Sequence, residues 1–467
     1  MSPTSPFSPL FNSLSSHPLN GSSPSEFFDT YPLITSRRLA KRTERPTKVK
    51  MLTSDFIEDS LYNPNYGYFP TQAQIFQTDS PFLYEDLEGT DDFMSAWLTQ
   101  YSKYSADQMA LQLWHTPTEL FQPYYGEAIA RYLLVNYKLN LYPYNDLIIY
   151  EIGGGNGTLM KNILDYIREN DPDVYTRTQY KIVEISKSLA DKQRMKALMV
   201  NMRDRGHDGK RVSVINKSIM DWDEVVPEPC FVVGMEVLDN LSHDVVKYDI
   251  ETGECHQGYV VIDEKGDFHQ FFSPEIDEWT RLYLDLRGEH FITKGDSKWR
   301  GVVSGLSTKG KPTSIHPLNE LKAVQRLRNW LSPFHNSLSV SEFIPTRLLQ
   351  LFSTLNQYFP EHQLILADFD SFNGQSEGYN SPVVQTMIDG KMVAASTYMV
   401  QQGYFDIMFP TDFHIARDLY IQTCGKLIET SKHDEFLRQW GDITSTTTKS
   451  GENPLLDFYP NAAFLHS

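Results

Sequence analysis

A short run of glycines behind an acidic residue is the first part of this sequence that could do chemistry. The segment LIIYEIGGGNGTL, residues 147–159, carries glycines at alternate positions, which are Gly153, Gly155 and Gly157. Side chains there would keep the backbone from approaching a ligand closely. No lysine follows the glycines, so the loop is not a phosphate-binding P-loop. Thr158 or Met160 stands where the dinucleotide fingerprint GxGxxG needs its third glycine, which disfavours NAD.

An acidic residue that leads alternate glycines, Glu151-x-Gly153-x-Gly155-x-Gly157, resembles the first motif of class I S-adenosylmethionine-dependent methyltransferases. A sulfonium cofactor carries no phosphate, so the missing lysine is no obstacle. We expect Glu151 to receive the cationic α-amino group of the methionine moiety, and the loop through Asn156 to lie along the cofactor. A glycine-rich turn that holds no ligand is the alternative.

A second acidic residue tests this interpretation. Glu184 ends the expected strand YKIVEI, beside the glycine loop, where its carboxylate could accept both ribose hydroxyls. The segment NKSIMDW should line the adenine, with Ser218 or Asp221 reaching the exocyclic amine and the Ile219 backbone nearby. Asp221 could equally cap the turn into Trp222, and Glu184 could be a solvated residue at a strand end.

Alternating strands and helices must position these residues. Apolar runs predict five buried strands: LIIYEI, YKIVEI, RVSVINKSI, CFVVGMEV and QLILADF. Residues 383–400 predict a hairpin, residues 158–170 an amphipathic helix that ends before Asp171-Pro172, and a further helix should begin near Lys187. This order predicts an α/β fold, a Rossmann-like doubly wound sheet of the class I methyltransferase type. In such a sheet, ligands bind beyond the carboxyl ends of the strands.

Length and composition exclude several other classes of protein. The chain has 467 residues and a formal net charge of -18, which argues against nucleic acid as a partner. No run approaches the roughly 18 apolar residues of a membrane span, so we expect no such span. The 3 cysteines stand far apart without a CxxC pair, so we expect neither a disulfide framework nor a cysteine zinc site, and no metal.

Composition also divides the chain into four sections. Residues 1–50 begin rich in Ser, Pro and Asn and end in the basic cluster SRRLAKRTERPTK, which predicts a flexible tail or targeting segment. Residues 51–135 should form an added N-terminal helical element, residues 136–430 the methyltransferase domain, and residues 431–467 a C-terminal extension. Residues 293–314 are rich in Gly, Ser and Lys and predict an exposed insertion loop.

With these features in place, the chain resembles the MidA-like family, the mitochondrial complex I assembly factor 7 type of protein arginine methyltransferase, and looks like a fungal member. The resemblance covers about residues 52–425 and rests on segments in the family's order: NPNYGYFP, TELFQPYYGEAIARYLL, EIGGGNGTL, YKIVEISKSL, GMEVLDNL, SEFIPTRLLQL, LILADFD and GYFDIMFPTDF. It implies a mitochondrial enzyme that uses S-adenosylmethionine to dimethylate an arginine symmetrically on a core subunit of respiratory complex I. The usual family stretch E-F-F-D-A-L-P reads EVLDNLSHD here.

Two acidic residues in GMEVLDNL fit the acceptor that the resemblance implies. A guanidinium has a pKa of about 12 or higher, so it attacks a methyl group only when its charge is stabilised and its lone pair is aimed. Glu236 ends the fourth expected strand and could clamp the guanidinium bidentately, while Asp239, one turn on, could share it. A helix N-terminal acid followed by a capping Asp is the alternative for this pair.

Other polar and aromatic residues nearby are expected to be structural. His243 and Asp244 predict polar surface rather than a catalytic base. The aromatic residues of FQPYYGE should pack on the added helical element, with the wall of an acceptor channel as the alternative. We therefore expect an S-adenosylmethionine-dependent protein methyltransferase directed to arginine, with a protein substrate and a mitochondrial location. A non-catalytic assembly or binding protein that keeps this fold is the alternative from another class.

Overall fold

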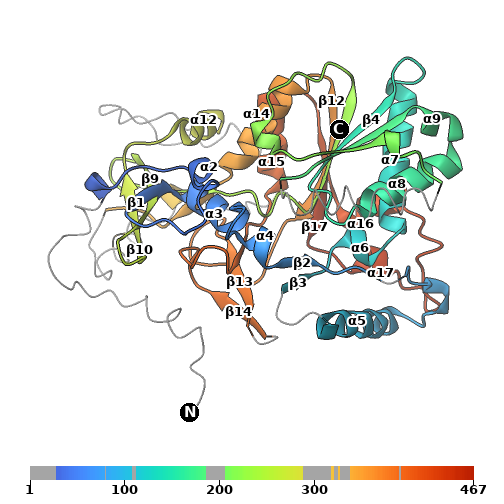
Figure 1. The fold of residues 1–467 in the computed structure, drawn as a ribbon, viewed down its shortest axis with the longest axis horizontal. Coiled ribbons are helices and arrows are strands. Elements are labelled where there is room, and N and C mark those ends of the chain that lie inside the picture. The colour runs from blue at the N-terminus through green and yellow to red at the C-terminus, as the bar shows by residue number, and fades with distance from the viewer. Residues whose placement is uncertain are drawn as a thin grey trace, which may run out of the picture.

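The computed structural model describes residues 28–78, 80–107, 112–185, 206–287, 317–319, 324, 326, 337–388 and 391–467. The helix expected from Lys187, the loop expected at residues 293–314 and the tip of the hairpin at residues 389–390 lie outside the described residues. In the described part of the chain, a seven-stranded mixed sheet occupies one half of the molecule and a five-stranded antiparallel sheet the other (Figure 1).

The seven-stranded sheet has the order β6-β5-β4-β7-β12-β17-β16. Its strands are β4 (Leu147–Ile152), β5 (Thr178–Val183), β6 (Val212–Ile215), β7 (Cys230–Met235), β12 (His362–Phe369), β16 (Glu429–Lys432) and β17 (Ala462–His466). The first five correspond to the five predicted strands and pair in parallel. Their spatial order, third, second, first, fourth and fifth along the chain, is that of a Rossmann-like sheet, so the predicted fold class is confirmed.

Helices cover both faces of this sheet. Alternate residues of β4 belong to different cores: Ile149 packs with α7 (Tyr124–Asn140) and α8 (Thr158–Asn170), and Tyr150 with α14 (Thr346–Tyr358) and α15 (Phe413–Cys424). A strand that is buried on both faces needs an almost continuous apolar run, which LIIYEI supplies. The predicted helix at residues 158–170 is confirmed, and Asp171 caps the short helix α9 (Pro172–Thr176) that follows.

The section predicted as a C-terminal extension, residues 431–467, completes the central sheet. β17 lies between β12 and β16 and pairs antiparallel with both. The chain returns to this position through α16 (His433–Trp440) and α17 (Pro454–Asp457). Phe464 and Leu465 of β17 are fully buried. This pairing could not be predicted from the sequence, because β16, with the sequence ETSK, has no apolar run.

The five-stranded sheet takes its first strand from the section predicted as a tail. Its members are β1 (Val49–Leu52), β8 (Asp244–Tyr248), β9 (Cys255–Ile262), β10 (Phe268–Ser273) and β11 (Glu342–Ile344). Upstream of β1, α2 (Ser36–Leu39) buries Leu39 completely. Residues 28–50 are therefore folded, contrary to the prediction, because a few apolar side chains among many charges anchor them. The helix α12 (Glu278–Leu286) packs against α14.

Residues 51–135 lie across the carboxyl edge of the central sheet, where α4, β2, β3 and α6 stand below the strands in Figure 1. This section is mixed rather than helical. It contains α3 (Thr53–Tyr62), α4 (Tyr68–Thr71), β2 (Ala73–Ile75), α5 (Thr90–Asp107), β3 (Gln112–Trp114) and α6 (Pro117–Leu120). α7 then crosses the boundary expected at residue 135. The predicted hairpin is confirmed as β13 (Val383–Ile388) and β14 (Lys391–Ala395), which form a small sheet with β15 (Asp406–Met408).

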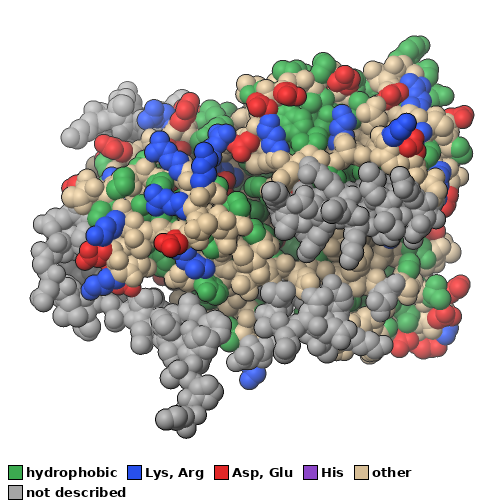
Figure 2. Space-filling model, in the orientation of Figure 1, with side chains coloured by type: hydrophobic (Ala, Val, Ile, Leu, Met, Phe, Trp, Pro, Cys, Tyr) green, Lys and Arg blue, Asp and Glu red, His purple; other side chains and the backbone are tan. Residues whose placement is uncertain are grey.

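The surface distributes its charge unevenly. Lysine and arginine side chains gather over α2 and β1 on the face seen in Figure 2, and α2 with the following turn supplies the exposed residues Arg37, Arg38, Lys41 and Arg42. Within the described ranges, no helix has the length and apolar character needed to cross a membrane.

Candidate active site

The glycine loop turns the chain from β4 into α8 at the carboxyl edge of the sheet. Gly153, Gly155 and Gly157 have φ angles of +71°, +48° and +79°, in the left-handed region that side chains disfavour. A Cβ atom on Gly153 would lie 2.9 Å from Val237 Cγ1, and one on Gly155 would lie 3.1 Å from Ile75 Cδ1. The loop is therefore held between the end of β7 and strand β2, with no room for side chains at these two positions.

Glu151 lies beneath this loop, on the side of the sheet core. It is 4% exposed, and its Oε2 would lie 3.4 Å from a Cβ atom on Gly154. The Tyr180 hydroxyl neighbours this carboxylate and interacts with it. Burial raises the pKa of Glu151 to about 8, and the charge of Glu184 adds to the rise.

Glu184 directly follows β5 and is buried beside the glycine loop. Its backbone carbonyl accepts a hydrogen bond from Asn216 Nδ2 at 2.8 Å, which ties the end of β5 to the end of β6. The sequence placed this residue correctly at the strand end next to β4. Glu184 is therefore positioned at the carboxyl end of β5, beside the loop.

The residues expected around the adenine have divided roles. Ser218 accepts a hydrogen bond from the backbone of Met220 at 3.2 Å and so caps the single turn Ile219–Asp221. Ile219 is buried in this turn. Asp221 instead faces α2, where its Oδ1 lies 3.4 Å from Arg37 Nη2. The structure brings Ser218 and Ile219 to the end of β6, whereas Asp221 is engaged with a surface cation.

Glu236 stands at the end of β7 in a strained conformation. Its φ of +55° lies in the left-handed region, which a residue with a side chain adopts only when the surrounding structure enforces it. The side chain is partly accessible, and its backbone N–H donates to Ala367 at 2.8 Å. Burial, followed by the charges of Asp368 and Glu119, raises the pKa of Glu236 well above its ordinary value.

Asp239 belongs to a cluster of buried carboxylates that also contains Asp368 and Asp406. Asp368 Oδ2 accepts hydrogen bonds from the backbone N–H groups of Leu238 at 2.6 Å and Asp239 at 3.0 Å. Asp239 Oδ1 has no hydrogen-bond partner among the described residues. Burial and the charges of Asp368, Asp406 and Glu236 raise the pKa of Asp239 well above its ordinary value. Such a cluster is costly when empty and favours a cationic group.

Several residues at this edge were not found from the sequence. Asp368 is the next-to-last residue of β12, Glu236 directly follows β7, and Asp406 begins β15. The first could have been found from its position at the end of the predicted strand QLILADF. The N-terminal section also reaches the site, because the Tyr62 hydroxyl donates to the Asn240 carbonyl at 3.3 Å. Nothing in the local pattern of α3 indicates that contact.

His243 and Asp244 are structural, but they are buried rather than at the surface as predicted. The His243 ring stacks on Phe409 with 3.9 Å between centroids, and burial lowers its pKa to about 4. Asp244 Oδ2 accepts a hydrogen bond from Thr346 Oγ1 at 2.6 Å. With a pKa of about 4 this buried imidazole is a weak base, and its ring is held in the stack.

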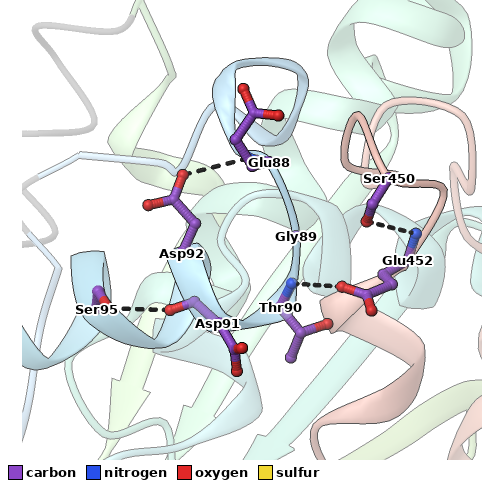
Figure 3. Close-up of a pocket in the computed structure, with 8 residues that line it drawn as sticks. All are labelled: Glu88, Gly89, Thr90, Asp91, Asp92, Ser95, Ser450 and Glu452. Atoms are coloured by element: carbon purple, nitrogen blue, oxygen red, sulfur yellow. Dashed lines mark hydrogen bonds between the residues drawn. The ribbon is translucent and has the colours of Figure 1, made fainter.

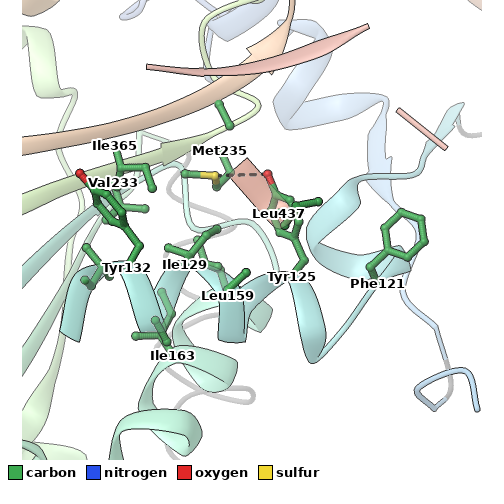
Figure 4. Packing of buried hydrophobic residues seen from close by; sticks show 14 of the residues in the cluster. Phe121, Tyr125, Ile129, Tyr132, Leu159, Ile163, Val233, Met235, Ile365 and Leu437 are labelled. Atoms are coloured by element: carbon green, nitrogen blue, oxygen red, sulfur yellow. Dashed lines mark hydrogen bonds between the residues drawn. The ribbon is translucent and has the colours of Figure 1, made fainter. Parts of the chain in front are cut away.

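Aromatic residues of FQPYYGE pack beneath the site. Phe121 and Tyr125 are buried, and Figure 4 shows the Tyr125 hydroxyl directed at the sulfur of Met235, to which it donates at 3.6 Å. Met235 immediately precedes Glu236, so this packing supports the end of β7.

An acidic pocket lies elsewhere, between the start of α5 and residues 450–452 (Figure 3). Glu452 occupies the N-terminus of α5 by accepting a hydrogen bond from the Thr90 backbone at 2.7 Å. No residue that the sequence predicted for the site lines this pocket. Among the residues that the structure describes, no group of His, Cys, Asp and Glu side chains is arranged to hold a metal ion.

Comparison with known families adds an independent finding. The family described as S-adenosyl-L-methionine-dependent methyltransferase matches residues 128–430. The chain is 22% identical over 409 residues to a Schizosaccharomyces pombe protein named protein arginine methyltransferase NDUFAF7 homolog, mitochondrial, covering 85% of this chain and 80% of that protein. A Saccharomyces cerevisiae protein of the same name is 23% identical over 377 residues, covering 74% of this chain and 79% of that protein.

Among solved structures, the fold is similar to a COG1565 superfamily member from Burkholderia thailandensis bound to S-adenosyl-homocysteine. The TM-score is 0.54 with 14% identity, and the alignment covers 96% of this chain and 95% of that chain. A native structure of a COG1565 protein from the same organism gives a TM-score of 0.52 with 13% identity. These likenesses extend over the N-terminal section and the last strands as well as the central sheet.

Proposed function

We propose, since this chain belongs to the family of S-adenosyl-L-methionine-dependent methyltransferases, that it transfers a methyl group to an arginine side chain of a mitochondrial protein. The acceptor expected from the family resemblance is a core subunit of respiratory complex I, dimethylated symmetrically. The names of the two fungal relatives, arginine methyltransferase and mitochondrial, support the residue type and the location.

The cofactor would lie across the ends of β5, β4 and β7. Gly153, Gly155, Asn156 and Gly157 would line its path, and Glu184 would accept the ribose hydroxyls. Ser218 and Ile219 would lie near the adenine, with Asp221 at the rim beside α2. Glu151 would support the loop from below. When bound, S-adenosylmethionine supplies an electrophilic methyl group on a sulfonium.

The observation that carries the arginine proposal is the group of buried acids around Glu236 and Asp239. Each has its pKa raised by burial and by neighbouring carboxylates, so the empty cluster disfavours its own ionisation. A guanidinium is a permanent cation with a planar set of donors that suits two carboxylates. Glu236 would orient the acceptor nitrogen, and Asp239 would share the positive charge and favour release of the proton that leaves on methylation.

Methyl labelling tests this proposal directly. The purified protein is incubated with tritiated S-adenosylmethionine and a mitochondrial extract that lacks the endogenous enzyme, and the labelled residue is mapped by mass spectrometry. The proposal predicts label on an arginine. Label on lysine or on a small molecule would reject the arginine assignment, and cofactor binding without any transfer would favour a non-catalytic assembly or binding protein.

A further inference from the structure

Glu119 is a buried acid of the N-terminal section that accepts hydrogen bonds from the glycine loop. It lies in the short helix α6, is 3% exposed, and stands outside the central sheet. Its Oε1 accepts hydrogen bonds from Asn156 Nδ2 at 3.0 Å and from Thr158 Oγ1 at 2.9 Å. One carboxylate oxygen therefore holds both the last part of the loop and the first residue of α8.

The second carboxylate oxygen of Glu119 takes no part in these hydrogen bonds. Oε2 is buried and has no hydrogen-bond partner among the described residues. The charge of Lys161 acts on this carboxylate, and its Nζ donates to Gln122 Oε1 at 3.3 Å. A buried carboxylate oxygen without a donor is costly, so a donor is expected at this point when the site is filled.

Glu119 lies near one end of the proposed cofactor path. Its charge acts on Glu236 at the end of β7, while its hydrogen bonds reach the loop after β4. In the sheet β4 lies between β7 and β5, and Glu184 follows β5. A cofactor whose ribose lies at Glu184 therefore directs its amino-acid end across the loop toward β7, where Glu119 stands.

We propose that Glu119 Oε2 receives the cationic α-amino group of the methionine moiety of S-adenosylmethionine and of its product. This assignment rests on the proposed function. In this assignment Glu119 contacts the α-amino group directly. Glu151, which lies beneath Gly154, supports the loop. Because Glu119 comes from the N-terminal section, that section would take part in binding the cofactor.

Two ligands that differ in the amino-acid part test the assignment. S-adenosylhomocysteine carries the α-amino group, and 5′-methylthioadenosine lacks the whole amino-acid end. Glu119→Gln keeps an oxygen for Asn156 and Thr158 but places an amide where the second oxygen was. Calorimetry should show S-adenosylhomocysteine bound about tenfold to a hundredfold more weakly by this variant, with 5′-methylthioadenosine bound as by the wild type.

A control separates recognition from support of the loop. Thr158→Val removes one donor to Glu119 and keeps its charge, so it should change the affinity for both ligands by the same factor. Equal losses for both ligands in Glu119→Gln, or no loss, would overturn the inference while the proposed function stands. Failure of the wild type to bind either ligand would overturn both.

A second variant covers the case in which Glu119→Gln does not fold. Glu119→Asp keeps the charge but withdraws it by one methylene group. Its affinity for S-adenosylhomocysteine relative to 5′-methylthioadenosine should fall at least about fivefold, because a charge-assisted hydrogen bond depends on its length. A ratio equal to that of the wild type would overturn the assignment.

Discussion

Glu236 and the three alternating glycines all hold backbone conformations with a positive φ. The glycines could be predicted, because alternate glycines after an apolar strand are typical of a loop that lies against a ligand. The positive φ of Glu236 could not, because nothing in the local sequence indicates that a residue with a side chain adopts this conformation. Glu119 and Asp406 were missed for a similar reason. They come from distant segments, and only the folded chain brings them to the ends of β4 and β7.

Gly155→Val tests the loop at the scale of one residue. The new side chain would begin 3.1 Å from Ile75 Cδ1 and would project from a left-handed backbone, so S-adenosylhomocysteine binding should fall at least about a hundredfold. Gly266→Val is the matched control, because Gly266 has a φ of +86° with no atom within 4 Å of its added Cβ. It should share the backbone strain and bind normally. Full-strength calorimetric binding by Gly155→Val would remove the loop from the cofactor site.

Buried acids also predict how stability changes with pH. Burial raises the pKa of Glu151 from 4.5 to about 8 and that of Asp406 from 3.8 to about 7. Their contribution to the free energy of unfolding is complete when the pH lies below their ordinary pKa values. It is lost as the pH rises through their raised pKa values. The pKa values of His243, His362 and His433 are lowered to about 4. These histidines therefore change the free energy of unfolding only below about pH 6.5. Between pH 6.5 and 8 the pH dependence of the free energy of unfolding therefore comes mainly from the buried carboxyl groups.

Urea denaturation without ligand should show the free energy of unfolding falling by about 2 kcal/mol from pH 6.5 to pH 8. Glu151→Gln removes one of these titrations and should reduce this slope. A wild-type stability that is constant or rises over this window would mean that these acids are not held protonated in the folded chain.

At the scale of elements, sequence patterns were informative where one strand or helix carries its own signal. The five parallel strands and α8 each combine an apolar run with a clear end, and all were predicted. β16 and β17 are short, and the first is polar, so their pairing with β12 depends on contacts that no local pattern records. The same holds for α2, whose single buried side chain is Leu39.

Phe464→Ala measures how much β17 contributes to the central sheet. Phe464 is fully buried, and its ring stacks on Phe436 with 3.9 Å between centroids. Its truncation should lower the free energy of unfolding by about 3–5 kcal/mol, as for other buried aromatic side chains. Leu427→Ala, at a residue 87% exposed, should leave the urea midpoint unchanged. An equal midpoint for both variants would mean that residues 431–467 are an appendage.

At the scale of the whole molecule, the proposed acceptor site lies where separate parts of the chain meet. The backbone carbonyl of Asp239 accepts a hydrogen bond from Phe409 at 2.7 Å, and Asn240 Nδ2 donates to Asp406 at 2.9 Å. These contacts join the end of β7 to the small sheet of β13, β14 and β15, while Tyr62 adds the N-terminal section. Composition could not predict this arrangement, because the contacts join segments that are far apart in the sequence.

The central claim is that one edge binds the cofactor and uses Glu236 to orient the acceptor, and Glu236→Gln measures both parts. The amide keeps the shape of the side chain and removes its charge. S-adenosylhomocysteine affinity should stay within about twofold of the wild type, while methyl transfer to arginine should fall about a hundredfold, which corresponds to about 3 kcal/mol in the transition state. Wild-type transfer by this variant, or a loss of cofactor affinity equal to the loss of transfer, would contradict the account.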